Sequence, residues 1–231
     1  MLERLIKDLK KLGNKEKAKI LSRFFKTGKG DYGEGDIFLG ITVPEQRKIA
    51  IKYKNIDLKD AEYLMLDKIH EFRLTAILIL VQKFQSGNNA EKKEIIDFYL
   101  KNNSKINNWD LVDLSADKIL GAHLIDKDRS ILYKLAESKN VWKRRIAIIS
   151  TFHLIKNNKF EDTMKISKLL LGDRHDLIQK AVGWMLREVG KKDRKMLLDF
   201  LDKHYKEVPR TMLRYSIEKF NDKERMHYLK N

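Results

Sequence analysis

Residues 177–184 read LIQKAVGW, and this segment sets the pattern on which the fold prediction depends. Its apolar residues recur at the spacing of one buried helix face. Four further segments align with it: EFRLTAIL (71–78), NNWDLVDL (107–114), WKRRIAII (142–149) and TMLRYSIE (211–218). The aligned central residues are Ala76, Val112, Ala147, Ala181 and Ser216, which lie 36, 35, 34 and 35 residues apart. This regular recurrence predicts a stack of similar helical repeats.

Shorter helices are predicted between the aligned segments, at Lys92–Leu100, Ser130–Ala136 and Met196–Leu201. A repeat of two helices is typical of TPR and HEAT proteins, and the Trp, Gly and Tyr pattern of TPR repeats is missing. We therefore predict an all-α, HEAT-like α-solenoid that forms a single domain over residues 1–231. Stacking would place the second helices along the concave, basic groove of a C-shaped molecule. The alternative is a helical bundle without repeats.

Glycine clusters in one short stretch, where Gly28, Gly30, Gly33, Gly35 and Gly40 occur. The letters of residues 28–33 satisfy the dinucleotide-binding fingerprint, but that fingerprint follows a strand and opens a helix. Here a helix ending in Phe24-Phe25-Lys26 precedes it and irregular chain follows, so we predict a loop between helices. Thr42-Val43-Pro44-Glu45 then predicts a capping box at the next helix start.

The composition indicates a binding partner that is a polyanion. Lys and Arg number 49 against 33 Asp and Glu, which gives a formal net charge of +16. Nucleic acid is the first candidate and an acidic membrane surface the second. The alternative explanation is general solubility, since lysine outnumbers arginine 36 to 13.

Several classes of protein are excluded or not expected. The chain has no cysteine, which excludes a disulfide scaffold, a thiol nucleophile and a zinc ribbon. It has no run of about 18 apolar residues, and its charged amphipathic start is not a signal peptide. These features lead us to expect an intracellular, soluble protein.

The sequence gives no reason to expect a metal or a cofactor. The six histidines are scattered, and no two have metal-ligand spacing on a helix. HExxH, GxSxG and P-loop motifs are missing.

Three segments carry residues suited to chemistry or to binding. Asn108 is expected to cap a helix, with Asp110 in its first turn, and Trp109 and Asp113 then share one face. An indole beside a carboxylate suits a cationic group; the alternative is a packed tryptophan beside a solvated aspartate. The other two segments combine tryptophan with cations. They contain Lys143, Arg144 and Arg145 after Trp142, and Lys180, Trp184 and Arg187 at spacings of four and seven residues.

Cations beside an aromatic ring suit a nucleic-acid backbone. Three successive cations would repel one another unless a polyanion meets them. The alternative readings are a solvated charged face for the first segment, and a core tryptophan with snorkelling cations for the second.

Together these segments resemble the DNA alkylation repair glycosylases of the AlkD family. The resemblance begins at RFFKTG (23–28) and covers most of the chain. Its most specific motifs are the WDxVD core at residues 109–113 and the KAxGWxLRE string at residues 180–188. It implies a HEAT-like α-solenoid that removes N3- and N7-alkylated purines from duplex DNA without flipping the base into a pocket.

The resemblance also implies residue roles. Asp113 would be the catalytic carboxylate, with Trp109 and Trp184 as the aromatic walls of a cleft. Arg145 matches an arginine that contacts DNA beside the lesion. Phe24 stands where some members have tyrosine, so a hydroxyl contact would be lost while the aromatic face remains. The cations of the two basic segments would hold phosphates: Lys143, Arg144, Lys180 and Arg187.

The implied chemistry fits these residue types. An alkylated purine is already a cation and can leave without protonation, which leaves a sugar of oxocarbenium character. A carboxylate can stabilise that charge and orient water. We therefore expect a monomeric, cytoplasmic enzyme that acts on duplex DNA, without metal or cofactor. The alternative is a non-catalytic HEAT-like module that binds nucleic acid or protein.

Overall fold

A computed structural model describes residues 1–230. In this part of the chain it has fourteen α-helices, and the only β-type pairing is an isolated bridge between Ile37 and Ile69. The prediction of an all-α protein is confirmed.

The helices belong to two compact units, Met1–Ser115 and Ala116–Asn231, and each is described by itself. The single domain over residues 1–231 expected from the sequence stays a prediction, and so does the concave basic groove.

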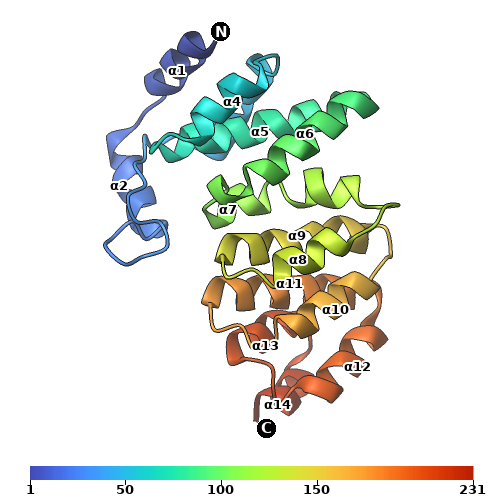
Figure 1. The fold of residues 1–231 in the computed structure, drawn as a ribbon. Coiled ribbons are helices and arrows are strands. Elements are labelled where there is room, and N and C mark those ends of the chain that lie inside the picture. The colour runs from blue at the N-terminus through green and yellow to red at the C-terminus, as the bar shows by residue number, and fades with distance from the viewer. Residues whose placement is uncertain (231) are drawn as a thin grey trace. The chain divides into compact units, whose positions relative to one another are not determined.

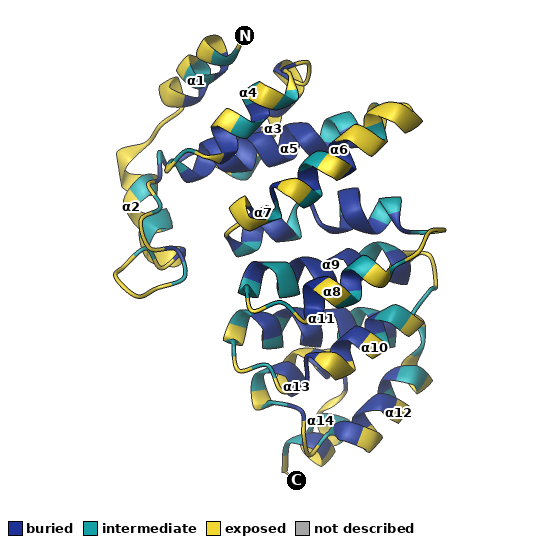
Figure 2. Cartoon of the chain, viewed as in Figure 1, coloured by how far each residue is buried: buried dark blue, intermediate teal, exposed yellow. Residues whose placement is uncertain are grey.

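The first unit is built around one long helix, α5. In chain order the unit contains α1 (Leu2–Lys11), α2 (Lys15–Phe24), α3 (Val43–Lys52), α4 (Leu58–Met65), α5 (His70–Ser86), α6 (Asn89–Lys101), the 3-10 turn η1 (Asn103–Lys105) and α7 (Trp109–Asp113). Helix α5 packs against α3, α4, α6 and α7. Because neighbours cover it on several sides, most of its length is buried (Figure 2).

The second unit consists of helix pairs. It contains the π-helical turn η2 (Asp117–Gly121), α8 (Ser130–Ala136), α9 (Val141–Lys156), α10 (Glu161–Leu169), α11 (Asp176–Lys192), α12 (Arg194–His204), α13 (Arg210–Ser216) and α14 (Asp222–Lys230). The second helices of successive pairs contact one another, α9 with α11 and α11 with α13. Figure 1 shows the three pairs α8–α9, α10–α11 and α12–α13 as successive layers of this unit.

The repeat predicted from the sequence is confirmed by the helix positions. The five aligned residues lie on α5, α7, α9, α11 and α13, and all five are buried. The shorter helices expected between them correspond to α6, α8 and α12. Each repeat buries the apolar face of its second helix, as a HEAT-like arrangement requires.

A glycine explains how two of these second helices approach each other closely. A Cβ at Gly183 of α11 would lie 2.5 Å from the carbonyl oxygen of Met212 and 2.6 Å from the Cβ of Tyr215, both on α13. Glycine is therefore needed here because of close helix packing rather than backbone flexibility.

The loop between α2 and α3 is also as predicted, and the next helix starts at the expected cap. The Glu45 carboxylate accepts hydrogen bonds from the backbone N–H and the hydroxyl of Thr42, at 2.9 and 2.6 Å. At Gly40 the backbone has φ +84°, and an added Cβ would overlap the backbone of α2 around Asn14. Only glycine fits both conditions.

A buried carboxylate ties this loop to the start of α5. Glu71 is 1% exposed, and it accepts backbone N–H groups from Leu39, Gly40 and Ile41 at 2.8–3.2 Å. Hydrogen bonds to a charged group are stronger than neutral ones. These hydrogen bonds therefore offset the cost of burying the carboxylate, and they fix the loop against the first turn of α5.

We predict that Glu71→Gln lowers the free energy of unfolding by about 2 kcal/mol, because an amide NH₂ replaces one accepting oxygen and the charge is lost. Urea unfolding followed by circular dichroism measures the change. The control is Glu45→Gln at the exposed capping box, which should cost about 1 kcal/mol or less. Equal losses in the two variants would contradict the role assigned to Glu71.

Candidate functional site

Helix α7 carries the two residues at the centre of the sequence prediction. The Asn108 side chain accepts the Trp109 backbone N–H at 2.8 Å, so the predicted cap is confirmed. Asp110 lies in the first turn, also as predicted. Trp109 and Asp113 are half-buried and stand four residues apart on this five-residue helix, which places them on one face.

Two phenylalanines from the end of α2 hold the Trp109 indole. The Phe25 ring stacks on it with centroids 5.0 Å apart and an interplanar angle of 8°. The Phe24 ring meets it edge-on at 5.8 Å and 77°. Phe25 is buried, whereas Phe24 is 63% exposed. Phe24 therefore offers an accessible aromatic surface next to Trp109.

A buried polar cluster that the sequence analysis missed lies directly behind this aromatic group. His70, 1% exposed, bonds Asp110 Oδ2 through Nε2 at 2.8 Å and Asp36 Oδ2 through Nδ1 at 3.1 Å. Arg73 donates to the same Asp36 oxygen at 2.6 Å. Asn108 Nδ2 donates to it at 3.2 Å. The cluster joins the α2–α3 loop, the start of α5 and the start of α7.

The charges of this cluster shift the pKa values of His70 and Asp36. Burial opposes the charged form of His70, but the hydrogen bonds to Asp110 and Asp36 outweigh it and raise the pKa of His70 above its ordinary value. Burial also opposes the charged form of Asp36, yet His70 and Arg73 lower the pKa of this carboxyl. His70 and Asp36 therefore favour each other's charged form.

One signal in the sequence points toward this cluster. Residues 70–73 read HEFR and stand directly before the apolar run that forms the rest of α5. Polar residues at the start of a fully buried helix need partners. Those partners are 34 and 40 residues distant from His70 in the chain, and no local pattern identifies them.

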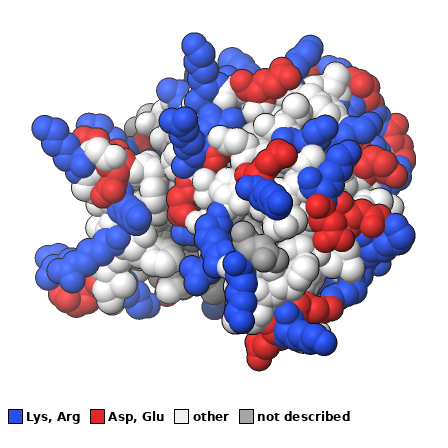
Figure 3. Space-filling view, turned by 90° about the horizontal axis from the view of Figure 1, so that it is seen from below, with Lys and Arg blue, Asp and Glu red and all other residues white. Residues whose placement is uncertain are grey.

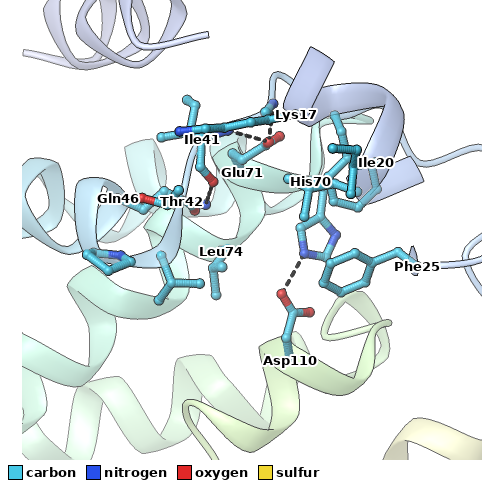
Figure 4. Close-up of a pocket in the computed structure, with 15 residues that line it drawn as sticks. Lys17, Ile20, Phe25, Ile41, Thr42, Gln46, His70, Glu71, Leu74 and Asp110 are labelled. Carbon is cyan, nitrogen blue, oxygen red and sulfur yellow. Dashed lines mark hydrogen bonds and ion pairs between the residues drawn. The ribbon is translucent and has the colours of Figure 1, made fainter. Parts of the chain in front are cut away.

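A cavity of about 390 Å³ borders His70, Phe25 and Asp110 (Figure 4). Most of its wall is apolar, and it includes Ile20, Phe25, Ile41 and Leu74. His70 and Glu71 also line the cavity, but they already form hydrogen bonds with other residues of the protein. The cavity therefore offers mainly apolar contact.

In the second unit, Trp184 is held by its own helix and by α9. Its indole Nε1 donates to Glu188 Oε1 at 3.2 Å, and the Phe152 ring packs against it with centroids 5.6 Å apart. Glu188 also pairs with Lys191 at 2.7 Å. These contacts fix the orientation of a half-buried indole.

The cations predicted to bind DNA differ in their surroundings. Arg144 pairs with Asp173, Nε to Oδ2 at 2.6 Å, and donates to two backbone carbonyls. Arg145 is 5% exposed and donates to the carbonyl of Leu177. Lys143, which precedes these two arginines in the sequence, is half-buried. The prediction that these cations need a polyanion is wrong for Arg144, because Asp173 compensates its charge.

The remaining predicted cations also have acidic neighbours. Lys180 pairs with Asp176 at 2.6 Å, and Arg187 pairs with Glu188 and Glu218. Lys180, Arg187 and Trp184 all belong to α11. Convergence of Trp184 with Trp109 and Asp113 would join the two units, and it stays a prediction.

The surface as a whole is basic, with acidic groups interspersed. Figure 3 shows that Lys and Arg cover more of the face it presents than Asp and Glu do, in line with the net charge of +16. Within residues 1–230, no group of three or more His, Asp or Glu side chains could hold a metal ion. None of the described helices has the length and hydropathy needed to cross a membrane.

Comparison with known proteins gives a family and a fold. Residues 5–220 match the sequence model of a family described as DNA alkylation repair enzyme. A predicted DNA alkylation repair enzyme from Enterococcus faecalis is structurally similar, with a TM-score of 0.71 and 20% identity, covering 91% of this chain and 97% of its own. AlkD2 from Streptococcus mutans is similar with a TM-score of 0.60 and 22% identity, covering 89% and 99%. No curated protein sequence matches the chain.

The two neighbouring cations at the start of α9 allow a direct test of their surroundings. We predict that Arg144→Ala lowers the free energy of unfolding by about 2 kcal/mol, because it leaves Asp173 buried without its partner. Lys143→Ala should change it by less than about 0.5 kcal/mol, as expected for a residue outside such a network. Urea unfolding measures both, and a Lys143→Ala loss as large as that of Arg144→Ala would refute the assignment.

Proposed function

The chain belongs to the DNA alkylation repair enzyme family, and from that membership we propose that it is a monofunctional DNA glycosylase of base-excision repair. It hydrolyses the bond between deoxyribose and a cationic N3- or N7-alkylated purine in duplex DNA. The family match over residues 5–220 carries the proposal, since it includes the Trp109–Asp113 helix.

The reaction needs no general acid. Alkylation has already made the purine a cation, so the electron pair of the glycosidic bond leaves with the base and yields a neutral purine. The sugar acquires oxocarbenium character, and a water molecule adds to C1′ and releases one proton. No pocket has to receive the base, which stays in the duplex, as the resemblance to the AlkD family implies.

In this proposal Asp113 is the catalytic carboxylate. It stabilises the positive charge that develops on the sugar and orients the attacking water. Trp109 stands one helical turn before it on the same face, where an indole adds cation–π attraction to the sugar cation. The stacking of Phe25 on Trp109 supports this role, because it fixes the indole before DNA arrives.

The remaining residues of the proposal belong to the second unit, apart from Phe24. Trp184 is the second aromatic wall, with its orientation fixed by Glu188. Arg145 contacts DNA beside the lesion, and Phe24 packs its exposed ring against the duplex. Phosphates are held by a set of basic side chains: Lys143, Arg144, Lys180 and Arg187. The paired members of this set, Arg144, Lys180 and Arg187, exchange protein carboxylates for phosphate.

The partner is therefore double-stranded DNA that contains alkylated purines, and the enzyme acts as a monomer without a cofactor. Since its substrate is chromosomal DNA, we place it in the cytoplasm, associated with the nucleoid.

Release of 7-methylguanine from methylated duplex DNA tests the reaction. We predict that Asp113→Asn cuts the single-turnover rate by about 10²-fold or more, on the scale of losing a charge-stabilising group. Duplex affinity should be preserved, because the side-chain shape is unchanged. The matched control is Asp97→Asn at an exposed position of α6, where the carboxylate pairs with Lys93 at the surface, and it should retain the wild-type rate.

Two results would overturn the proposal. Release at the wild-type rate by Asp113→Asn would remove the carboxylate from the mechanism. A wild-type protein that binds duplex DNA but releases no alkylated base would favour the non-catalytic binding module.

We also predict that duplex affinity falls by orders of magnitude between about 50 and 200 mM salt, because phosphate contacts release counterions. Lys143→Ala and Lys180→Ala should each reduce the slope of log affinity against log salt by about one. Fluorescence anisotropy of a labelled duplex measures the slope. Lys93→Ala is the control and should leave it unchanged; a flat salt dependence of the wild-type protein would exclude binding through phosphates.

A further inference from the structure

His70 forms hydrogen bonds through both of its ring nitrogens. Its two ring nitrogens face two different carboxylates, Asp110 at 2.8 Å and Asp36 at 3.1 Å. An ionised carboxylate only accepts hydrogen bonds, and a neutral imidazole has only one N–H to donate. The imidazolium form alone satisfies both contacts at once.

The charges around His70 lead to the same form. Arg73, from the same helix, donates to Asp36 at 2.6 Å and lies 3.4 Å from His70 Nδ1, where its charge opposes the imidazolium. Asp36 and Asp110, which faces His70 from α7 (Figure 4), act in the other direction. The neighbouring Glu71 directs its carboxylate to the amides of Leu39–Ile41. Two carboxylates with Arg73 alone would leave one uncompensated negative charge in a buried site, and a charged His70 neutralises it.

His70 is also part of an aromatic column that ends at Trp109. Its ring lies 4.7 Å from the Phe38 ring and 4.8 Å from the Phe25 ring. Phe25 in turn stacks on Trp109. Figure 4 shows the Phe25 ring at the side of the His70 imidazole, and a hydrogen bond between the imidazole and Asp110.

We propose that His70 is a positioning residue of the candidate site: as an imidazolium clamped between Asp36 and Asp110, it fixes the start of α7 and thereby the orientation of Trp109 and Asp113. It touches no DNA and acts through two contacts, the bond to Asp110 in the first turn and the Phe25 ring against the indole. For catalysis, this inference rests on the glycosylase function proposed above.

The inference has a pH signature. Because the pKa of His70 is raised in the folded protein, its stabilising contribution is fully present below the ordinary histidine value, about 6.5. It is lost as pH rises through the raised folded value. Loss of the proton leaves one carboxylate facing a lone pair, so α7 should loosen on the alkaline side.

The test begins with the wild-type protein, which needs no variant to fold. Nuclear magnetic resonance of the imidazole gives the charge of His70 at each pH, and the indole N–H signals report on the three tryptophans, each assigned by its Trp→Phe variant. We expect His70 to be charged at pH 7 and the Trp109 signal to follow its titration, while those of Trp142 and Trp184 do not. A His70 that is neutral at pH 6, or a Trp109 signal that ignores its titration, would overturn the inference.

The kinetic test uses His70→Gln, with His227→Gln on exposed α14 as the control. His70→Gln should lower the single-turnover rate of base release about 10- to 100-fold, the scale of a small misplacement of catalytic groups, with duplex affinity within about twofold of wild type. It should also lose the alkaline limb of the pH profile. An unchanged rate and pH profile would refute the positioning role.

Two further outcomes keep the inference separate from the proposed function. In a double-mutant cycle, His70→Gln combined with Asp110→Asn should be no slower than the slower single variant, because both act through one pair; independent, multiplying effects would count against the pair. If the wild-type protein releases no base although the Trp109 indole signal follows the titration of His70, the glycosylase proposal fails but the link between His70 and Trp109 is supported. If the protein releases base but the Trp109 indole signal does not change with the titration of His70, only the positioning role of His70 fails.

Discussion

Burial of the second helix of each repeat is the constraint on which the rest of the molecule depends. Helix α5 is covered by α3, α4, α6 and α7, and α9 by η2, α8, α10 and α11. Little of their length reaches solvent, so the charged side chains of α5 and α9 lie near the ends of these two helices. The cluster at residues 70–73 and the cations at residues 143–145 both stand in the first turns of such helices.

This constraint explains why polar groups at helix starts carry so many partners. The start of α5 has a positive dipole end, yet it is buried against a loop rather than exposed to water, and its His70 backbone N–H donates to the Ile37 carbonyl of that loop at 2.9 Å. Glu71 and His70 respond differently to that position. The Glu71 carboxylate satisfies amides of the loop, and His70 compensates two carboxylates from other elements. Removal of one partner would leave another group unpaired, which costs more than the bond itself is worth.

The sequence was sufficient to predict what depends on local pattern and periodicity. The repeat spacing identified the five second helices, and Thr42 with Glu45 marked the start of α3, because both signals lie within a few residues of one another. The WDxVD motif likewise placed Trp109 and Asp113 on one face, since i and i+4 are neighbours on any helix.

The rest could not be predicted because it depends on contacts between distant segments. Asp36 reaches His70 across 34 residues and Arg144 reaches Asp173 across 29. A run of basic letters such as residues 143–145 looks uniform in the sequence, but tertiary packing gives Arg144 a carboxylate and Arg145 a backbone carbonyl. Which cations keep their charge available for a ligand is therefore a property of the fold.

The two aspartates of α7 differ in their surroundings. Asp110 uses one oxygen on the Leu111 amide and the other on His70, and it is buried. Asp113, three residues later, is half-buried on the face that also carries Trp109. In the proposed mechanism, a carboxylate that faces an imidazolium has less charge to offer a developing sugar cation, which favours Asp113 over Asp110 as the catalytic group. The contacts of Asp110 attach the first turn of α7 to α5, and on the positioning role proposed for His70 this attachment orients the face that carries Asp113.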